Sequence, residues 1–202
     1  MHLLRHALSD GDGESAVTDA AGRAAAVTDA AGRAAAVTDA AGRAAAVTVV
    51  VIGIGNDLRR DDGIGPAVAA AVATRRLPGV RVLACAAEPA AILDAWDGAD
   101  VAVLVDAAVD DDLLPGRVRR WAAADLAVSN RLSSHDLDLR QTYELGVALG
   151  RVPQSAVVIT VDVADTGHGS GLTPAVAVAL PEAVEMVLAV IEHAKEAAHQ
   201  QP

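Results

Sequence analysis

Hydrophobic residues in the second part of this chain come in blocks that have the lengths of strands and helices. Residues 49–54, VVVIGI, form a continuous apolar run, which is typical of a strand covered on both faces in a mostly parallel sheet. Similar runs at residues 80–85, 99–105 and 156–163 predict three more strands. Residues 116–121 alternate with arginines between the apolar positions, and this pattern predicts an edge strand.

Helical patterns lie between these strands. They predict helices over residues 65–76, 88–96 and 137–149, and a final helix over about residues 173–195. Gly150 supplies the glycine that often follows the end of a helix. Strands that alternate with helices of this length indicate an α/β domain. The predicted fold is a three-layer α/β/α sandwich around a mostly parallel sheet of about five strands, with a phosphorylase/hydrolase-like arrangement.

An internal repeat precedes the first strand. The decapeptide AVTDAAGRAA begins at Ala16 and recurs, identical, at Ala26 and Ala36. A glycine in each copy costs a helix about 1 kcal/mol relative to alanine, and known solenoid repeats are mostly longer than this unit. The low complexity predicts a dispensable, poorly ordered segment over residues 1–45, followed by one domain over residues 46–202.

Composition and charge narrow the class of protein. Of 202 residues, 52% are hydrophobic but only 1% are aromatic, so the core must be built from Ala, Val, Leu and Ile. The net charge of −11 disfavours nucleic acid or an anionic membrane surface as the main partner. The single cysteine, Cys85, cannot form a disulfide within the chain. With no signal-peptide pattern, we expect a cytoplasmic protein that acts as a monomer, away from membranes.

Three polar residues are expected where the strands end. In open α/β sheets, ligands bind beyond the carboxyl ends of the strands. Asp62 follows the first strand, Asp106 ends the third, and His135 lies in a polar loop before a helix. Two carboxylates and an imidazole suit a divalent ion such as Ni²⁺ or Zn²⁺. Each also fits a simpler role, as a turn aspartate or an exposed histidine, and spacing alone does not show that they converge.

The turn after the first strand contains two glycines. Gly53 and Gly55 allow a sharp turn or the close approach of a ligand, and we expect them to shape a substrate cleft together with Asn56. The adjacent Asp61 and Asp62 also fit a helix cap and a turn residue.

Two other side chains have reactive groups. His168, in the loop TGHGSG, is a possible ligand or substrate contact, although a flexible loop residue is the simpler interpretation. Cys85 fits a small buried residue better than a nucleophile, because no histidine is near it in the sequence and nothing there suggests a lowered pKa.

The segment GIGN followed by DDGIG, within residues 49–65, resembles the opening motif of the hydrogenase maturation endopeptidases. The later segment GSGLTPAVAVAL, from Gly169 to Leu180, is similar to the stretch that leads into the last helix of that family. The resemblance covers about residues 47–195. It implies an aspartic-type, nickel-recognising endopeptidase that removes the C-terminal extension of a nickel-iron hydrogenase large-subunit precursor after metal insertion.

The same resemblance implies which residues act. Asp62, Asp106 and His135 match the family's metal-binding positions, so they are expected to be both the metal ligands and the catalytic residues. Nickel is expected to arrive with the substrate, although zinc or another divalent ion also suits the site.

Two other functions fit the sequence. The first is a nucleotide-binding α/β module, but Leu58 stands where a dinucleotide motif has its third glycine, and no P-loop lysine motif occurs. The second is a non-catalytic chaperone that senses the metal state of its partner without cutting it.

Overall fold

The computed structural model describes residues 47–109, 114–123 and 134–200, without the side chains of residues 134–138. Five strands form one sheet in the order β2-β1-β3-β5-β4. Strands β2, β1, β3 and β5 are parallel, and β4 runs antiparallel to β5 at the edge of the sheet. The strands are β1 (Val49–Ile54), β2 (Val80–Cys85), β3 (Val101–Ala108), β4 (Val118–Ala122) and β5 (Ser155–Asp162). The predicted sheet and its edge strand are confirmed.

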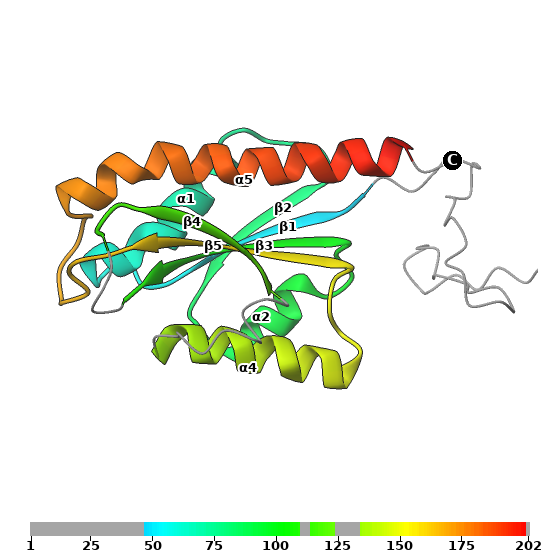
Figure 1. The fold of residues 1–202 in the computed structure, drawn as a ribbon, viewed down its shortest axis with the longest axis horizontal. Coiled ribbons are helices and arrows are strands. Elements are labelled where there is room, and N and C mark those ends of the chain that lie inside the picture. The colour runs from blue at the N-terminus through cyan, green and yellow to red at the C-terminus, as the bar shows by residue number, and fades with distance from the viewer. Residues whose placement is uncertain (1–46, 110–113, 124–133, 201–202) are drawn as a thin grey trace, which may run out of the picture. The chain divides into compact units, whose positions relative to one another are not determined.

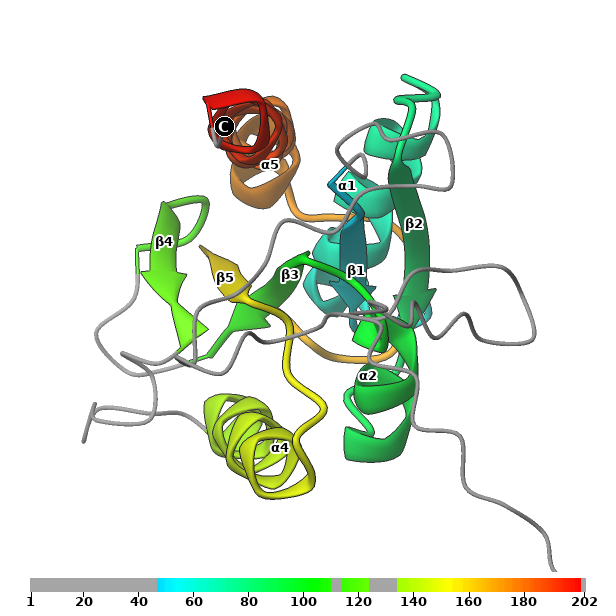
Figure 2. The ribbon, with the colours of Figure 1, turned by 90° about the vertical axis from the view of Figure 1, so that its right-hand side faces the viewer.

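Helices cover both faces of this sheet (Figures 1 and 2). The view in Figure 2 has α5 and α1 on one side of the strands and α4 and α2 on the other. A short 3-10 helix, η1, lies between β1 and α1. The helices are η1 (Arg60–Gly63), α1 (Ile64–Ala73), α2 (Pro89–Trp96), α4 (Ser134–Leu149) and α5 (Pro174–Gln200). The three-layer α/β/α arrangement is thus confirmed.

Small aliphatic side chains fill the core on both sides of the sheet. One cluster joins the sheet to α1 and α5, and a second joins it to α2 and α4. All six residues of β1 are buried, as expected for a central strand with helices on both faces. Trp96 is the one aromatic side chain among the buried core residues of the described chain.

Helix α5 is the one helix among the described residues that is long and apolar enough to cross a membrane, judged by length and composition alone. Its apolar residues also cover the sheet and α1. The side chains buried in this way recur at helical spacing: Val176, Ala179, Ala183, Val184, Val187, Val190 and Ile191. Packing in the core therefore accounts for the apolar residues on one face of α5.

Two element boundaries differ from the sequence prediction in ways that affect the site. Strand β3 continues through Asp106 to Ala108, because its ladder with β5 extends to the pair Ala108 and Asp162. Asp106 therefore lies inside a strand and not at its end. Helix α4 begins at Ser134, so His135 lies in the first turn of a helix and not in the loop before it.

Candidate functional site

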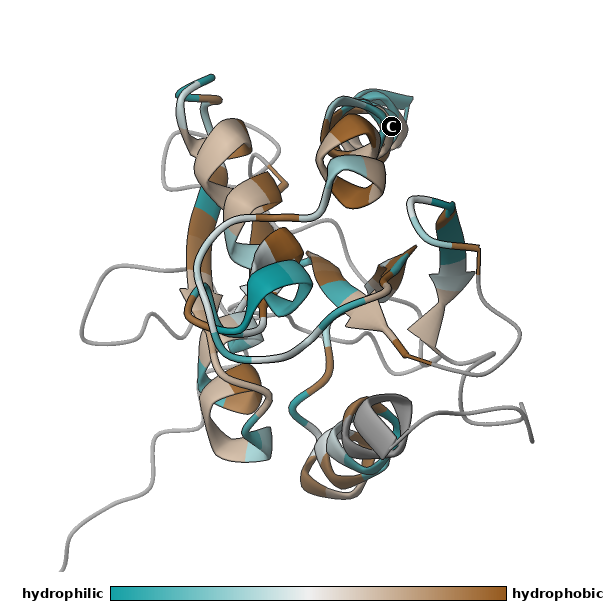
Figure 3. Ribbon diagram, turned by 90° about the vertical axis from the view of Figure 1, so that its left-hand side faces the viewer, coloured by the Kyte–Doolittle hydropathy of each residue, from teal (hydrophilic) through white to brown (hydrophobic). Residues whose placement is uncertain are grey.

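The strand order places a topological switch point between β1 and β3. Strand β1 connects through α1 to β2 on one side, while β3 pairs with its other side. Ligands of open α/β sheets bind outside the carboxyl ends of the strands at such a point. Asp106 belongs to β3, Asp62 belongs to η1, and η1 contacts β3. In Figure 3 the hydrophilic η1 turn lies in front of the apolar strands at this edge.

Asp106 is buried on the side of the sheet that faces α2 and α4. Ala102 and Leu104, which alternate with it along β3, belong to the core cluster on that side. The carboxylate is 2% exposed, and its Oδ1 accepts a hydrogen bond from the main-chain N–H of Ala107 at 2.8 Å. Its lateral neighbour on β5 is Thr160, also buried.

Asp62 is held in the turn that follows β1. Its side chain is 7% exposed, and Oδ2 accepts a hydrogen bond from the main-chain N–H of Asn56 at 3.0 Å. Gly55 makes this turn possible, since its φ of +133° is a conformation that favours glycine. A β-carbon at Gly55 would also lie 3.1 Å from the carbonyl carbon of Asp62 and overlap its oxygen. The glycine therefore lets the chain fold back onto the acidic turn.

Gly53 and Gly65 permit close packing between β1 and α1. A β-carbon at Gly53 would lie 2.6 Å from the carbonyl carbon of Gly65 and 2.7 Å from the β-carbon of Ala69. One at Gly65 would lie 2.5 Å from the carbonyl oxygen of Val105, next to Asp106. Protein atoms fill the space beside these two glycines, so the absence of their side chains serves the packing of α1 against β1. A cleft formed by Gly53, Gly55 and Asn56 stays a prediction.

His135 lies in the first turn of α4, and not in the loop that the sequence predicted. Helix α4 begins at the edge where β3 and β5 end, on the face of the sheet to which Asp106 points (Figure 1). The side chain of His135 is outside the described residues. Among the described residues, no group of three or more His, Cys, Asp and Glu side chains is placed to hold a metal ion. The ligand set Asp62, Asp106 and His135 therefore stays a prediction.

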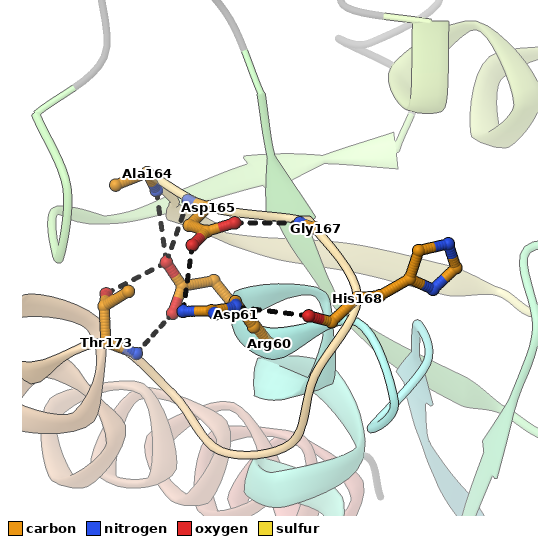
Figure 4. Close-up of polar contacts among 7 residues, drawn as sticks. All are labelled: Arg60, Asp61, Ala164, Asp165, Gly167, His168 and Thr173. Carbon is orange, nitrogen blue, oxygen red and sulfur yellow. Dashed lines mark hydrogen bonds and ion pairs between the residues drawn. The ribbon is translucent and has the colours of Figure 1, made fainter.

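Asp61 does not cap a helix, because the N-cap of α1 is Gly63 and makes no side-chain hydrogen bond. Its carboxylate is fully buried and accepts four hydrogen bonds (Figure 4). Oδ2 accepts from the N–H groups of Ala164 and Asp165 at 3.3 and 3.1 Å. The hydroxyl of Thr173 donates to Oδ2 at 2.9 Å, and its N–H donates to Oδ1 at 2.6 Å. Asp61 thereby binds the segment between β5 and α5.

His168 lies in this same segment, residues 164–173. Its side chain is exposed, and the imidazole points away from Asp61 in Figure 4. Its carbonyl accepts a hydrogen bond from Nε of Arg60 at 3.4 Å. The main chain of His168 is thus attached to η1, and a role of its imidazole in ligand or substrate binding stays a prediction.

Asp162, at the end of β5, forms a second buried cluster at this edge. Its carboxylate is fully buried and forms an ion pair with Arg119 and a longer one, at 3.7 Å, with Arg117. It also accepts a hydrogen bond from the N–H of Leu114 at 3.1 Å. These contacts fix the start of β4 against β5.

The thiol of Cys85, at the end of β2, is a poor nucleophile in this setting. Burial raises the pKa of the thiol above its ordinary value, and the charges of Asp106 and Glu88 raise it further. Because the thiolate is the reactive form, these neighbours suppress reactivity. The raised pKa of the thiol favours the prediction from the sequence that Cys85 is not a nucleophile.

Sequence reasoning missed the roles of Asp61 and Asp162. A usable signal existed for Asp162, because it is the one charge in the apolar run AVVITVDV, and a charge in a buried strand needs a partner. For Asp61 there was no signal, since its partners lie more than 100 residues away in the sequence.

A comparison with protein-family models identifies one family. A family model described as hydrogenase maturation protease matches residues 66–190, more than half of the chain. This match begins after Asp62 and includes Asp106 and His135. A search of curated proteins gave no significant match.

Solved structures with the same fold include the hydrogenase maturating endopeptidase HybD from E. coli, with a TM-score of 0.65, 24% identity, and coverage of 73% of this chain and 93% of that chain. The solution structure of an endopeptidase from Escherichia coli has the same TM-score and coverage, with 25% identity. The NiFe hydrogenase maturation protease HybD from Thermococcus kodakarensis has a TM-score of 0.61, 22% identity, and coverage of 71% of this chain and 99% of that chain.

Proposed function

The chain belongs to the hydrogenase maturation protease family, and we propose that it removes the C-terminal extension of a nickel-iron hydrogenase large-subunit precursor after nickel insertion. In this proposal nickel is part of the substrate. Its presence in the precursor licenses the cleavage.

The observation that supports this function best is the burial of two carboxylates at the switch point of the sheet. Asp62 and Asp106 are both more than nine-tenths buried, and a main-chain N–H orients each of them. Carboxylate oxygens combined with the imidazole of His135 form a donor set that suits nickel or zinc. The proposed role of these three residues is to bind the metal of the precursor and hold its tail for cleavage.

A bound divalent ion supplies Lewis acidity, which can polarise the scissile carbonyl or activate a water molecule. The protein's own task is then to keep both carboxylates in fixed positions before the substrate arrives. Held in this way, they lose little mobility when the metal binds. A cysteine mechanism through Cys85 is disfavoured, because burial and the nearby charges raise the pKa of the thiol.

The experiment is a mass measurement on a nickel-loaded large-subunit precursor before and after incubation with this chain. We expect the loss of a short C-terminal peptide, and we expect no loss from a nickel-free precursor. The variant His135→Ala should fold normally and leave the precursor uncut, because it lacks one proposed metal ligand. An undiminished cleavage rate in that variant would contradict the proposed site.

The same experiment separates proteolysis from the chaperone alternative. A chaperone that senses the metal would form a stable complex with the nickel-loaded precursor without changing its mass. Pull-down of an uncut, nickel-loaded precursor together with this chain would therefore support the chaperone and contradict the protease proposal.

A further inference from the structure

Two distant parts of the sequence meet at one buried carboxylate. Asp61 lies in η1, and its four hydrogen-bond donors belong to residues 164–173, with Thr173 lying 112 positions further along the chain. The main-chain N–H of Asp61 also donates to the carbonyl of Asp165 at 3.0 Å. Both carboxylate oxygens are thus used to attach the start of α5 and the end of β5 to η1.

Neighbouring residues extend this attachment on both sides of Asp61. The N–H of Arg60 donates to the carbonyl of Gly169 at 2.9 Å, and the N–H of Gly169 donates to the carbonyl of Leu58 at 2.9 Å. Arg60 also forms an ion pair with Asp165 at 3.1 Å. The acidic turn and the segment 164–173 therefore form one connected unit, of which Asp61 is the buried centre.

This unit bears directly on Asp62. The two aspartates are adjacent in a single four-residue helical turn, and the N–H of Asp62 donates to the carbonyl of Arg59 within it. A change in the position of Asp61 must shift the main chain of Asp62. A catalytic group displaced by about 1 Å can cost on the order of a hundredfold in rate, so the attachment of Asp61 bears on any chemistry at Asp62.

We propose that Asp61 is a positioning residue for the cleavage reaction: by binding the segment 164–173, it holds Asp62 in its place at the carboxyl edge of the sheet. The proposal rests on the proposed function for its link to catalysis. Asp61 itself contacts neither metal nor substrate in this scheme. Its effect reaches the reaction through the geometry of η1.

The test uses the full chain with Asp61→Asn, which keeps the shape of the side chain but replaces one acceptor oxygen with a donor. We expect amide hydrogen exchange at Asp165 and Thr173 to become about tenfold faster, because charged hydrogen bonds that hold the segment are lost. Cleavage of the nickel-loaded precursor should show a kcat that is lower by about tenfold, with KM within about twofold of the wild-type value.

Two matched substitutions keep the proposal testable even where Asp61→Asn folds poorly. Thr173→Val removes only the hydroxyl donor to Asp61, and it should lower kcat and speed exchange in the same direction but by less. Thr173→Ser restores the hydroxyl and should return both values toward the wild type. The control is Glu185→Gln, which alters an exposed ion pair with Arg75 outside the segment 164–173 and leaves the carboxylate of Asp61 intact, so it should change neither value.

Unchanged exchange at Thr173 in Asp61→Asn would overturn the proposal, as would faster exchange with unchanged kcat. Failure of the wild-type chain to cleave the precursor is a different result, because it would overturn the proposed function. Exchange at Asp165 and Thr173 would then still decide whether Asp61 holds the segment.

Discussion

Four aspartates are removed from water at the carboxyl edge of the sheet, and the described hydrogen bonds assign them different tasks. Asp61 and Asp162 bind segments that are distant in the sequence. Asp62 closes a local turn, and Asp106 faces the same layer as α4. A buried carboxylate without partners would cost several kcal/mol, and each of the four accepts at least one described hydrogen bond.

The reactivity of the Cys85 thiol can be used to test the charge of Asp106. Burial is the main cause of the raised pKa of the thiol, and the negative charge of Asp106 raises it further. The variant Asp106→Asn should therefore lower that pKa and speed alkylation of Cys85 at about pH 8.5, near the ordinary thiol pKa. The measurement is the rate of iodoacetamide modification. Asp94→Asn is the control, since Asp94 is exposed and pairs with Arg151. Equal rates in the two variants would show that Asp106 does not act on the thiol.

The sign of the linked effect on stability follows from the same pKa. A raised pKa means that the folded protein keeps the thiol proton at a pH where the unfolded chain has lost it. This stabilisation is fully present below the pKa of the unfolded thiol, about 8.5, and it is lost as the pH rises through the folded pKa. The free energy of unfolding of the wild type should therefore fall in that range, relative to Cys85→Ala.

At the scale of elements, the turn between β1 and η1 is the most constrained connection at the site. It combines a left-handed glycine with direct contact between Gly55 and the main chain of Asp62. The strand and the helix on either side follow from hydrophobic pattern. The turn follows from the absence of a side chain at Gly55.

Substitution at Gly55 should show how strongly this turn depends on glycine. Gly55→Ala is expected to lower the free energy of unfolding by about 3 kcal/mol or more, because backbone strain and overlap with Asp62 act together. Cleavage activity should fall further than stability explains, since Asp62 moves. The control is Gly98→Ala, with φ of +68° and no atom within 4 Å of the added carbon; it should cost about 1 kcal/mol. Similar costs in a urea denaturation series would contradict this account.

Most elements could be predicted from the sequence because each depends on local patterning. Strand β2 was predicted with its observed bounds, and the buried run of β1 was recognised from its unbroken apolar residues. The end of β3 was predicted too early, because a polar residue inside a strand looks like a strand end until its partner strand is known. Asp106 is held in the strand by pairing with Thr160.

At the scale of the whole molecule, the strand order could not be predicted from these patterns. Alternating strands and helices are compatible with several orders, and the order decides which strand ends meet. Only the pairing of β1 with β3 brings η1 and Asp106 to one switch point. The resemblance to a family supplied the residue set, whereas the roles of Asp61 and Asp162 required the fold.

The N-terminal repeats lie outside the described residues, and the division of the chain at residues 45 and 46 stays a prediction. A chain of residues 46–202 should unfold at the same temperature as the full chain and cleave the nickel-loaded precursor at the same rate. The reason is that the low-complexity repeats lack the apolar pattern needed to build a core. A lower melting temperature or slower cleavage in the shortened chain would give the repeats a role.

The contact between Asp61 and Thr173 can form only late in the synthesis of the chain. Asp62 and Asp106 leave the ribosome well before Thr173, which follows Asp61 by 112 residues. Contacts across such long stretches form late, since closing the intervening loop costs entropy that only later contacts recover. A nascent chain therefore contains both carboxylates before the donors that fix Asp61 exist. The edge of the sheet becomes fully ordered only when the beginning of the C-terminal helix has been synthesised.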